Sequence, residues 1–446
     1  MKIQKLLILI SLIFTLSNCK KTTQNGETDN SEALFQLLPS EKTHVDFQNV
    51  ITEGLNTNVL MYEYFYNGGG VAVGDVNNDG LEDLYFTSNM QVNRLYLNRG
   101  NMAFEDVSAL SGVKGREGPW KTGATMADVN GDGLMDIFVC YSGAVRPENR
   151  MKQLFINQGN DNNGVPQFVD KAAEYGLDNV STTTQAAFFD YDRDGDLDMF
   201  LLNHNIKSLP VLNVLNTTET LKIEDPISGS RLFRHDKGKN GQPHFTDVTK
   251  QAHLSSSPLS YGLGIGIADF NQDGWQDMYI SNDNTVPDYL YINDKKGGFT
   301  NQINECLGHT SMYSMGNDVS DINNDGLMDI FTLDMLPEDN RRQKLLMASD
   351  SYEKFNFNVQ MGFGYQYMRN MLQINQVESN KSNVISSSNS TTYNSGLTAF
   401  SEIGQLAGIS NTDWSWAALF ADYDNDGWKD LYITNGYLRD YTNLVG

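Results

Sequence analysis

One nine-residue pattern of acidic and amide side chains, D-x-[DN]-x-D-G-x-x-D, occurs six times in the chain. Its copies are DVNNDGLED from Asp75, DVNGDGLMD from Asp128, DYDRDGDLD from Asp190, DFNQDGWQD from Asp269, DINNDGLMD from Asp321 and DYDNDGWKD from Asp422. Positions 1, 3, 5 and 9 offer Asp or Asn oxygens, position 7 offers a backbone carbonyl, and the glycine at position 6 permits the turn that points these oxygens inward. Calcium is a hard cation that takes about six to eight oxygen ligands. The pattern therefore predicts a calcium-binding loop that is repeated along the chain.

The predicted ligands of up to six calcium ions are the residues at positions 1, 3, 5, 7 and 9 of each loop. They are Asp75, Asn77, Asp79, Leu81, Asp83, Asp128, Asn130, Asp132, Leu134, Asp136, Asp190, Asp192, Asp194, Asp196, Asp198, Asp269, Asn271, Asp273, Trp275, Asp277, Asp321, Asn323, Asp325, Leu327, Asp329, Asp422, Asp424, Asp426, Trp428 and Asp430. Without a cation, the carboxylates within one loop would repel one another. Six calcium ions, at two charges each, would halve the formal net charge of −24. Chelation of calcium is therefore expected to destabilise the protein.

An EF-hand is the main alternative, because it opens with similar residues. It also needs a bidentate Glu at position 12 and a helix on each side. Position 12 of the six loops is occupied by Phe86, Val139, Leu201, Ile280, Thr332 and Ile433. Each of these residues lies in a strand-like run, so the pattern excludes an EF-hand. Magnesium is disfavoured because it usually keeps several of its waters.

Strand-like segments surround the loops at regular offsets. Each loop is preceded by a run of small and apolar residues such as GLGIGIA and followed by an apolar run such as MYISND. Further on lie LYLN from Leu95, LFIN from Leu154, LYIN from Leu290 and LQIN from Leu372, and FxD-like strand starts at Phe104, Phe168, Phe245, Phe299 and Phe400. This arrangement gives four short strands per unit, and radially repeated four-stranded sheets are propeller blades. The sequence predicts an all-β, calcium-binding β-propeller with six blades favoured and seven possible.

Residues 33–446 are assigned to this propeller. The last unit lacks a fourth strand, and we expect LFQLL at 34–38, which precedes FQNV at Phe47, to supply it and to close the ring. Three insertions interrupt the pattern. They are 206–243, which is irregular, 337–370, which is partly helical, and 376–396, which is rich in Ser and Asn.

The N-terminus has the layout of a secretory signal. Lys2 and Lys5 precede an apolar stretch of 11 residues from Leu6 to Leu16, which is too short to span a bilayer. Residues 1–19 end in LSNC, which resembles a bacterial lipobox and predicts lipidation of Cys19. An ordinary signal peptide with another cleavage site is the alternative, because Asn18 departs from the usual small residue. Residues 20–32 are polar and predict a flexible tether, so lipid alone would attach the protein to a membrane.

The remaining composition excludes several classes of protein. The net charge of −24 disfavours binding to nucleic acid, whose phosphates would be repelled. None of the three cysteines forms a C-x-x-C motif, so a zinc or thioredoxin-like site is not expected. Cys140 lies in an apolar run and predicts a buried free thiol, with a disulfide between Cys140 and Cys306 as the alternative.

The loops, together with GGGVAVGD and LYLNRGNMAFEDVS, resemble FG-GAP/VCBS repeats such as those of the integrin α-subunit propeller. The closer resemblance is to bacterial exported repeat proteins of the cartilage acidic protein (ASPIC/UnbV-associated) type. This resemblance implies a β-propeller with calcium bound in its loops and a role in adhesion or recognition. It also implies that the metal loops are structural and lie away from the ligand face.

Catalytic motifs are missing from the sequence. It contains no H-E-x-x-H, no G-x-S-x-G and no phosphate-binding loop. Gly262, Gly264 and Gly266 alternate in a strand and predict close packing rather than a dinucleotide fingerprint. His204 follows a strand and is expected to be structural, with a place in a site as the alternative. The tryptophans that precede the loops are expected to pack between blades or, alternatively, to form a platform for a sugar; they are Trp120, Trp414 and Trp416.

The sequence therefore predicts an exported, lipid-anchored calcium propeller that binds a glycan or an envelope protein. We expect it at the outer membrane, on the periplasmic or the cell-surface side, and we do not expect an enzyme. The alternatives are a polysaccharide lyase or hydrolase of the propeller type, and a structural subunit of an outer-membrane complex. The sequence makes no prediction about oligomeric state.

Overall fold

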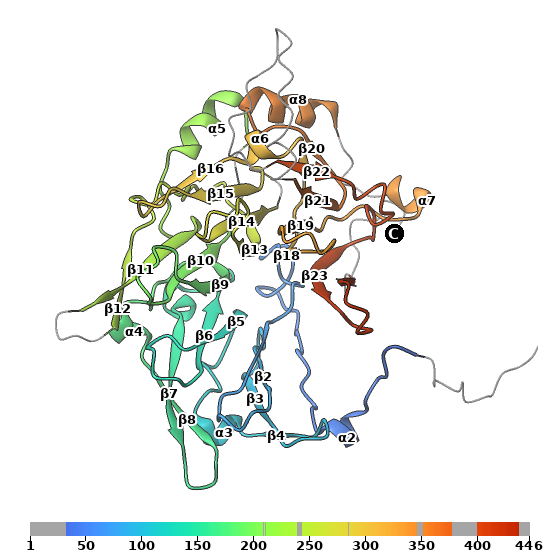
Figure 1. Cartoon of the computed structure of the whole chain (residues 1–446). Helices are drawn as coiled ribbons and strands as arrows, with labels where there is room; N and C mark the ends of the chain where they lie inside the picture. The colour runs from blue at the N-terminus through green and yellow to red at the C-terminus, as the bar shows by residue number, and fades with distance from the viewer. Residues whose placement is uncertain are drawn as a thin grey trace, which may run out of the picture. The chain divides into compact units, whose positions relative to one another are not determined.

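The structure is a computed structural model and describes residues 33–207, 209, 211–238, 243–283, 285–345, 351–376 and 399–436. The chain divides into two units, residues 1–38 and residues 39–446. All helices and strands of the described residues lie in the second unit (Figure 1). The predicted signal peptide, its Cys19 and the tether lie outside the described residues.

The second unit is built from antiparallel sheets that follow one another in chain order, which confirms the all-β prediction. We call each sheet a blade, because the arrangement is propeller-like. The first blade is β1 (Val71–Gly74), β2 (Asp83–Phe86), β3 (Arg94–Asn98) and β4 (Phe104–Asp106), and the second is β5 (Lys121–Ala127), β6 (Asp136–Tyr141), β7 (Gln153–Asn160) and β8 (Pro166–Asp170). The third is β9 (Thr183–Phe189), β10 (Asp198–Asn203), β11 (Arg231–Lys237) and β12 (Pro243–Asp247), and the fourth is β13 (Gly262–Ala268), β14 (Asp277–Asn282), β15 (Tyr289–Asn293) and β16 (Phe299–Asn301). The fifth is β18 (Asn317–Ser320), β19 (Asp329–Thr332), β21 (Met371–Asn375) and β22 (Phe400–Glu402), and the sixth has β23 (Ser415–Ala421) and β24 (Asp430–Asn435) among the described residues.

Short helices lie in the segments between the strands. They are α2 (Ser40–Thr43), α3 (Ser108–Ser111), α4 (Ala172–Tyr175), α5 (Val214–Leu221), α6 (Ile303–Cys306), α7 (Asn340–Gln343) and α8 (Tyr352–Met361), with a 3₁₀ turn η1 at Pro147–Arg150. Two short strands, β17 (Thr310–Ser311) and β20 (Gln366–Tyr367), form a parallel pair. In the chain, β17 precedes β18 and β20 precedes β21 of the fifth blade. Helices α7 and α8 lie within the predicted insertion 337–370, as its helical pattern indicated. No helix among the described residues is long and apolar enough to cross a membrane.

Two boundary predictions were wrong. The segment 34–38 forms no strand, and its Leu37 is 95% exposed, so it lacks the apolar burial that holds a blade strand in place. The FQNV segment forms no strand either; instead the ring of Phe47 stacks on Phe86 of the first blade, with centroids 4.9 Å apart. The predicted insertion 206–243 contains β11, the third strand of the third blade, which sequence reasoning missed because it reads RLFRH rather than LYLN. Residues 377–396 of the third insertion lie outside the described residues.

The middle strands are buried on both faces, because each blade packs between its neighbours. Strands β6, β10 and β14 are buried at every position, which explains why they read as continuous apolar runs. Cys140 and Cys306 are buried free thiols, as the apolar run around Cys140 predicted, and they belong to different hydrophobic clusters. The alternative disulfide between them is therefore not formed.

Glycines in the first strands let neighbouring blades approach closely. A Cβ atom on Gly264 would lie 2.8 Å from the backbone nitrogen of Asn317 in the fifth blade. A Cβ atom on Gly123 would lie 2.6 Å from the carbonyl oxygen of Thr184 in the third blade. Real Cβ atoms do not approach backbone atoms this closely, so these positions admit only glycine. The packing interpretation of the alternating Gly262, Gly264 and Gly266 is confirmed.

Substitution of Gly264 by Ala should therefore destabilise the protein. Forcing one methyl group against backbone costs about 1–3 kcal/mol of the free energy of unfolding. Gly308 is the matched control, because a Cβ atom there meets no atom within 4 Å. Urea unfolding should place Gly308→Ala within about 0.5 kcal/mol of the wild type. Equal midpoints for the two variants would contradict the close-packing interpretation.

Candidate metal loops and axial cavity

Each predicted metal loop connects the first strand of a blade to the second, so all six occur at the same end of their blades. Two residues of each loop adopt the left-handed backbone conformation. One is the glycine at position 6, for example Gly274 with φ 85°, and this requirement explains the glycine in every copy. The other is position 4, for example Gln272 with φ 55°. Position 4 tolerates Asn, Gly, Arg and Gln, and so the sequence pattern hides this requirement.

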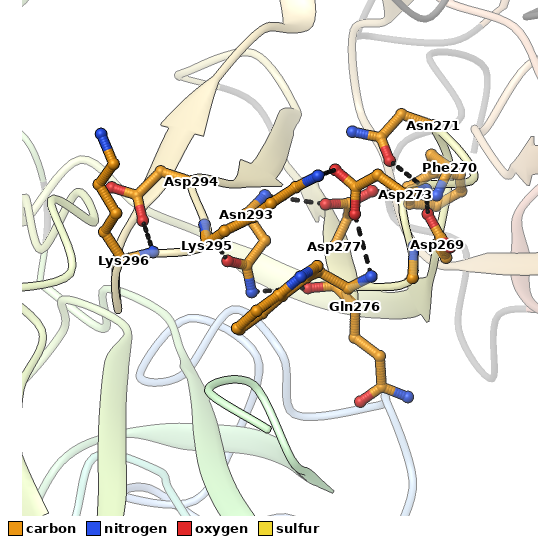
Figure 2. Close-up of polar contacts among 12 residues, drawn as sticks. Asp269, Phe270, Asn271, Asp273, Gln276, Asp277, Asn293, Asp294, Lys295 and Lys296 are labelled. Atoms are coloured by element: carbon orange, nitrogen blue, oxygen red, sulfur yellow. Dashed lines mark hydrogen bonds and ion pairs between the residues drawn. The ribbon is translucent and has the colours of Figure 1, made fainter. Parts of the chain in front are cut away.

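The side chain at position 1 closes the turn. In the fourth loop, Asp269 accepts hydrogen bonds from the backbone nitrogen of Asp273 at 2.9 Å and from that of Gly274 at 2.7 Å (Figure 2). The Asp273 carboxylate in turn accepts from the Trp275 nitrogen at 3.0 Å. The same contacts recur in the other loops. The loops are therefore closed by contacts within the motif itself, and these contacts orient their carboxylates.

The Asp at position 9 ties the loop to the third strand of its own blade. Asp277 is fully buried and accepts from the backbone nitrogen of Phe270 at 3.0 Å and from that of Asn293 at 2.8 Å (Figure 2). Burial raises the pKa of Asp277 to about 7. The equivalent carboxylates of the other four-stranded blades accept the same pair of bonds. The Asp at position 9 therefore anchors the third strand to the loop, a structural role that the sequence pattern did not predict.

An Asn at the end of the third strand joins successive blades. The side-chain nitrogen of Asn293 donates to the carbonyl of Tyr191 in the third blade at 2.8 Å and to the Gln276 carbonyl of its own blade at 3.3 Å. Asn157 and Asn375 make the corresponding bonds, to Val76 and Phe270 of the preceding blades. The sequence signal for this contact is the Asn that ends LFIN, LYIN and LQIN. The sequence pattern predicted only a strand at these positions.

Loops of neighbouring blades also contact one another directly. Asn78 donates to the Gly133 carbonyl at 3.2 Å, and Gln272 donates to the Gly326 carbonyl at 2.9 Å. Asn324 makes the same bond to Gly427 at 3.0 Å. In each case the side chain at position 4 reaches position 6 of the next loop. These bonds place the loops side by side along one face of the second unit.

The third and sixth loops fit a hard cation best. The carboxylates of Asp190, Asp192 and Asp194 offer oxygens within 4.8 Å of one another, and the equivalent groups of the sixth loop do the same. Oδ1 of Asp192 is buried and has no hydrogen-bond partner among the described residues. A buried carboxylate oxygen without a donor is costly. A cation at this point would satisfy that oxygen and relieve the repulsion between the three carboxylates.

Loops with Asn at position 3 are closed differently. The amide nitrogen of Asn77 donates to Asp79 at 3.0 Å, and Asn130 and Asn323 do the same to the Asp at position 5 of their loops. In the fourth loop, the ammonium of Lys295 lies 3.1 Å from Asp273. These donors partly compensate the carboxylate charge that a calcium ion would otherwise neutralise.

A cavity of about 270 Å³ lies where the first strands of the blades meet. Its lining comes from the segments before β1 and β18 and from β1, β5, β9, β13 and β23. The lining residues stand at or near the beginnings of the first strands, whereas the metal loops follow the ends of these strands. The cavity therefore opens at the face opposite the loops, and we call it the axial cavity.

Two tyrosines from the segment before β1 cover this face of the second unit. The Tyr62 hydroxyl lies 3.2 Å from the Ser142 hydroxyl and 3.1 Å from Nε2 of His204, and Tyr64 donates to Asp283 at 3.0 Å. Both rings line the axial cavity. Burial lowers the pKa of His204 to about 3 and raises that of Asp283 to about 7. His204 is therefore a buried, neutral residue, as its structural interpretation predicted.

The comparisons with known proteins bear on the loops. A model of the FG-GAP-like repeat matches residues 66–139 and 269–332, which include the first, second, fourth and fifth loops. The chain carries FG-GAP-like repeats. It is also distantly homologous to cartilage acidic protein 1, with 27% identity over 243 residues in Xenopus tropicalis and 26% over 238 residues in Homo sapiens. These alignments cover 53% of this chain but 32% and 31% of the relatives, so the chain spans about a third of their length.

Solved structures similar to this chain include two carbohydrate-related proteins. One is an Agrocybe aegerita lectin described as recognising non-reducing terminal N-acetylglucosamine, at 12% identity and a TM-score of 0.40, with 81% of this chain and 73% of the lectin covered. The other is a GH43 β-1,3-galactosidase at 10% identity and a TM-score of 0.32, with 60% and 86% covered. Similarity at this level transfers neither ligand nor activity.

The tryptophans that precede the metal loops separate into two groups. Trp120 is buried against Tyr62 and Phe65 beneath the covering segment, with ring centroids 5.6 and 4.9 Å away. Trp414 and Trp416 lie together in the sixth blade, and Trp416 lines the axial cavity with Trp120. Sequence reasoning missed Tyr62 and Tyr64, because their partners lie 80 to 219 residues away along the chain.

Proposed function

We propose that this chain is an exported, lipid-anchored FG-GAP-like propeller, stabilised by calcium, that binds carbohydrate at the cell envelope. The proposal rests on one observation: the acidic loops and the cavity lie at opposite faces of the second unit. One face holds loops of converging carboxylates, and the opposite face opens into a cavity lined by aromatic rings and polar groups. Ligand sites are typically concave and mostly apolar, with a few placed polar groups.

Calcium is proposed for the third and sixth loops first and for up to six loops in total. The three carboxylates of the third loop and the unpartnered oxygen of Asp192 support this assignment. When bound, calcium would supply only charge and coordination, and the carboxylates would hold it through oxygens that the turn has already oriented. Position 9 would then add a ligand that also anchors the third strand.

A binding role is favoured over catalysis by the state of the buried polar groups. Ser142 and His204 lie 3.2 Å apart, which is the spacing of a nucleophile and its general base. The pKa of His204 is lowered to about 3 by burial, so it is too weak a base to activate a hydroxyl at neutral pH. Both residues are fully buried, and the Tyr62 hydroxyl is in contact with each of them.

The proposal is tested by binding to immobilised polysaccharides. The full chain, purified in detergent and loaded with calcium, should be retained by at least one polysaccharide and should release no fragments. The same chain stripped with EDTA is the control, and its retention should fall as the loops lose their ions. Released oligosaccharide would establish a lyase or hydrolase instead. Retention by no polysaccharide would remove carbohydrate as the ligand and leave an envelope protein as the partner to seek.

A further inference from the structure

The lining of the axial cavity is uncharged. Among the described residues that line it there is no Asp, Glu, Lys, Arg or His, in a chain that has 56 acidic and 32 basic residues. The walls consist of aromatic rings, small residues and three kinds of neutral polar side chain: Asn, Thr and Gln. A charged ligand would lose its hydration in this cavity without meeting a compensating charge, which is costly.

Two polar side chains in the lining are available to a ligand. The carboxamides of Asn67 and Gln185 have no hydrogen-bond partner among the described residues, and Gln185 is exposed. A carboxamide offers two donors and an acceptor, which matches hydroxyl groups that donate and accept at once. By contrast, the hydroxyls of Thr122 and Thr184 are already bound to the carbonyls of Thr183 and Gly262, at 2.7 and 2.8 Å.

The aromatic walls are held in place by contacts outside the cavity. The indole nitrogen of Trp416 donates to the Gly436 carbonyl at 2.7 Å. The hydroxyls of Tyr62 and Tyr64 are anchored on Ser142 and Asp283. These contacts fix the positions of the three side chains in the cavity wall, and of the three Trp416 is the least buried. Preorganised walls lower the entropic cost of binding.

We propose that the axial cavity binds one uncharged sugar ring of a glycan. The inference rests on the proposed carbohydrate-binding function and adds the site and the ligand class. The volume of about 270 Å³ lies slightly below the usual range for ligand sites, roughly 300–1,000 Å³, which favours a single ring. Hydroxyl groups would bond to Asn67 and Gln185, and the apolar face of the ring would lie against Trp416. Uronic acids and sulfated sugars would be rejected, because the cavity offers no cation and the chain is strongly acidic.

The test compares neutral and anionic polysaccharides on the full, calcium-loaded chain. Neutral glucans, mannans and galactans are presented beside alginate and polygalacturonate at the same ionic strength. Ala417→Phe fills the cavity from an exposed wall position and should weaken retention at least tenfold. Gln185→Ala removes one hydrogen-bonding group and should weaken it about 3–10-fold. Gln405→Ala changes an exposed glutamine outside the lining and should leave retention unchanged.

The outcomes separate this inference from the proposed function. Retention by neutral polymers that both cavity variants weaken, and that the matching free monosaccharide competes, would support the axial site. Retention that is insensitive to both variants, or that is confined to the anionic polymers, would overturn the axial site while carbohydrate binding stands. Retention by no polymer would overturn both. If Ala417→Phe melts below the wild type, Gln185→Ala and monosaccharide competition still decide the result.

Discussion

Removal of calcium should lower the melting temperature of this protein by about 6 °C or more. An ion present at about 100 times its dissociation constant adds about 2.7 kcal/mol per site to the free energy of unfolding, and the third and sixth loops alone provide two sites. The effect adds to the repulsion that chelation restores between Asp190, Asp192 and Asp194. The measurement is a thermal scan of the calcium-loaded chain with and without EDTA, with metal analysis of the purified protein.

Magnesium at the same concentration is the control for ionic strength and charge. It should recover less of the stability, because it exchanges its waters for protein ligands reluctantly. The calcium content per chain tells how many loops are occupied, and two ions are expected if only the loops with Asp at position 3 bind. A protein that carries no calcium and melts identically in EDTA and in calcium would remove the metal from the proposal.

Asp277→Ala should destabilise the protein both with and without calcium, by about 2–6 kcal/mol. The substitution leaves the buried backbone nitrogens of Phe270 and Asn293 without an acceptor, and each such loss costs about 1–3 kcal/mol. It also releases the third strand from the loop. Urea unfolding at saturating calcium and in EDTA measures the two costs separately.

Asp192→Ala is the matched variant in the same kind of loop. Because Oδ1 of Asp192 has no hydrogen-bond partner among the described residues, its removal should be costly only when calcium is present. In EDTA the variant should be as stable as the wild type or slightly more so, since one of three neighbouring carboxylates is gone. If Asp277→Ala were silent in EDTA, the position 9 carboxylate would act only as a metal ligand and the hydrogen-bonding role would be wrong.

The strands and loops were predictable because their causes are local. The glycine at position 6 must adopt a left-handed conformation, and Asp269 closes its turn on the next five residues, so each copy of the motif contains its own reason to fold. The apolar runs on either side follow from burial on both faces. The prediction failed at β11 for the same reason. Its sequence RLFRH departs from the LYLN pattern, although its backbone pairs with β10 and β12 as the third strand of the blade.

The axial cavity was not predictable from the sequence, because no local pattern encodes it. Tyr64 contacts Asp283, 219 residues further along the chain, and the axial cavity is lined by residues from separate segments between Tyr62 and Ala417. Asn67 and Gln185 belong to no motif, and they line a common cavity only because the first strands pack together.

The amino-acid sequence by itself determined the repeat, the all-β fold and the acidic loops for which we propose calcium, since each depends on neighbours within about ten positions. Only the tertiary structure decided that Asp277 also anchors a strand and that Asn293 joins two blades. It also decided that an uncharged cavity opens opposite the loops, lined in part by Tyr62 and Tyr64. These features depend on contacts between distant segments, and such contacts exist only after the blades have packed against one another.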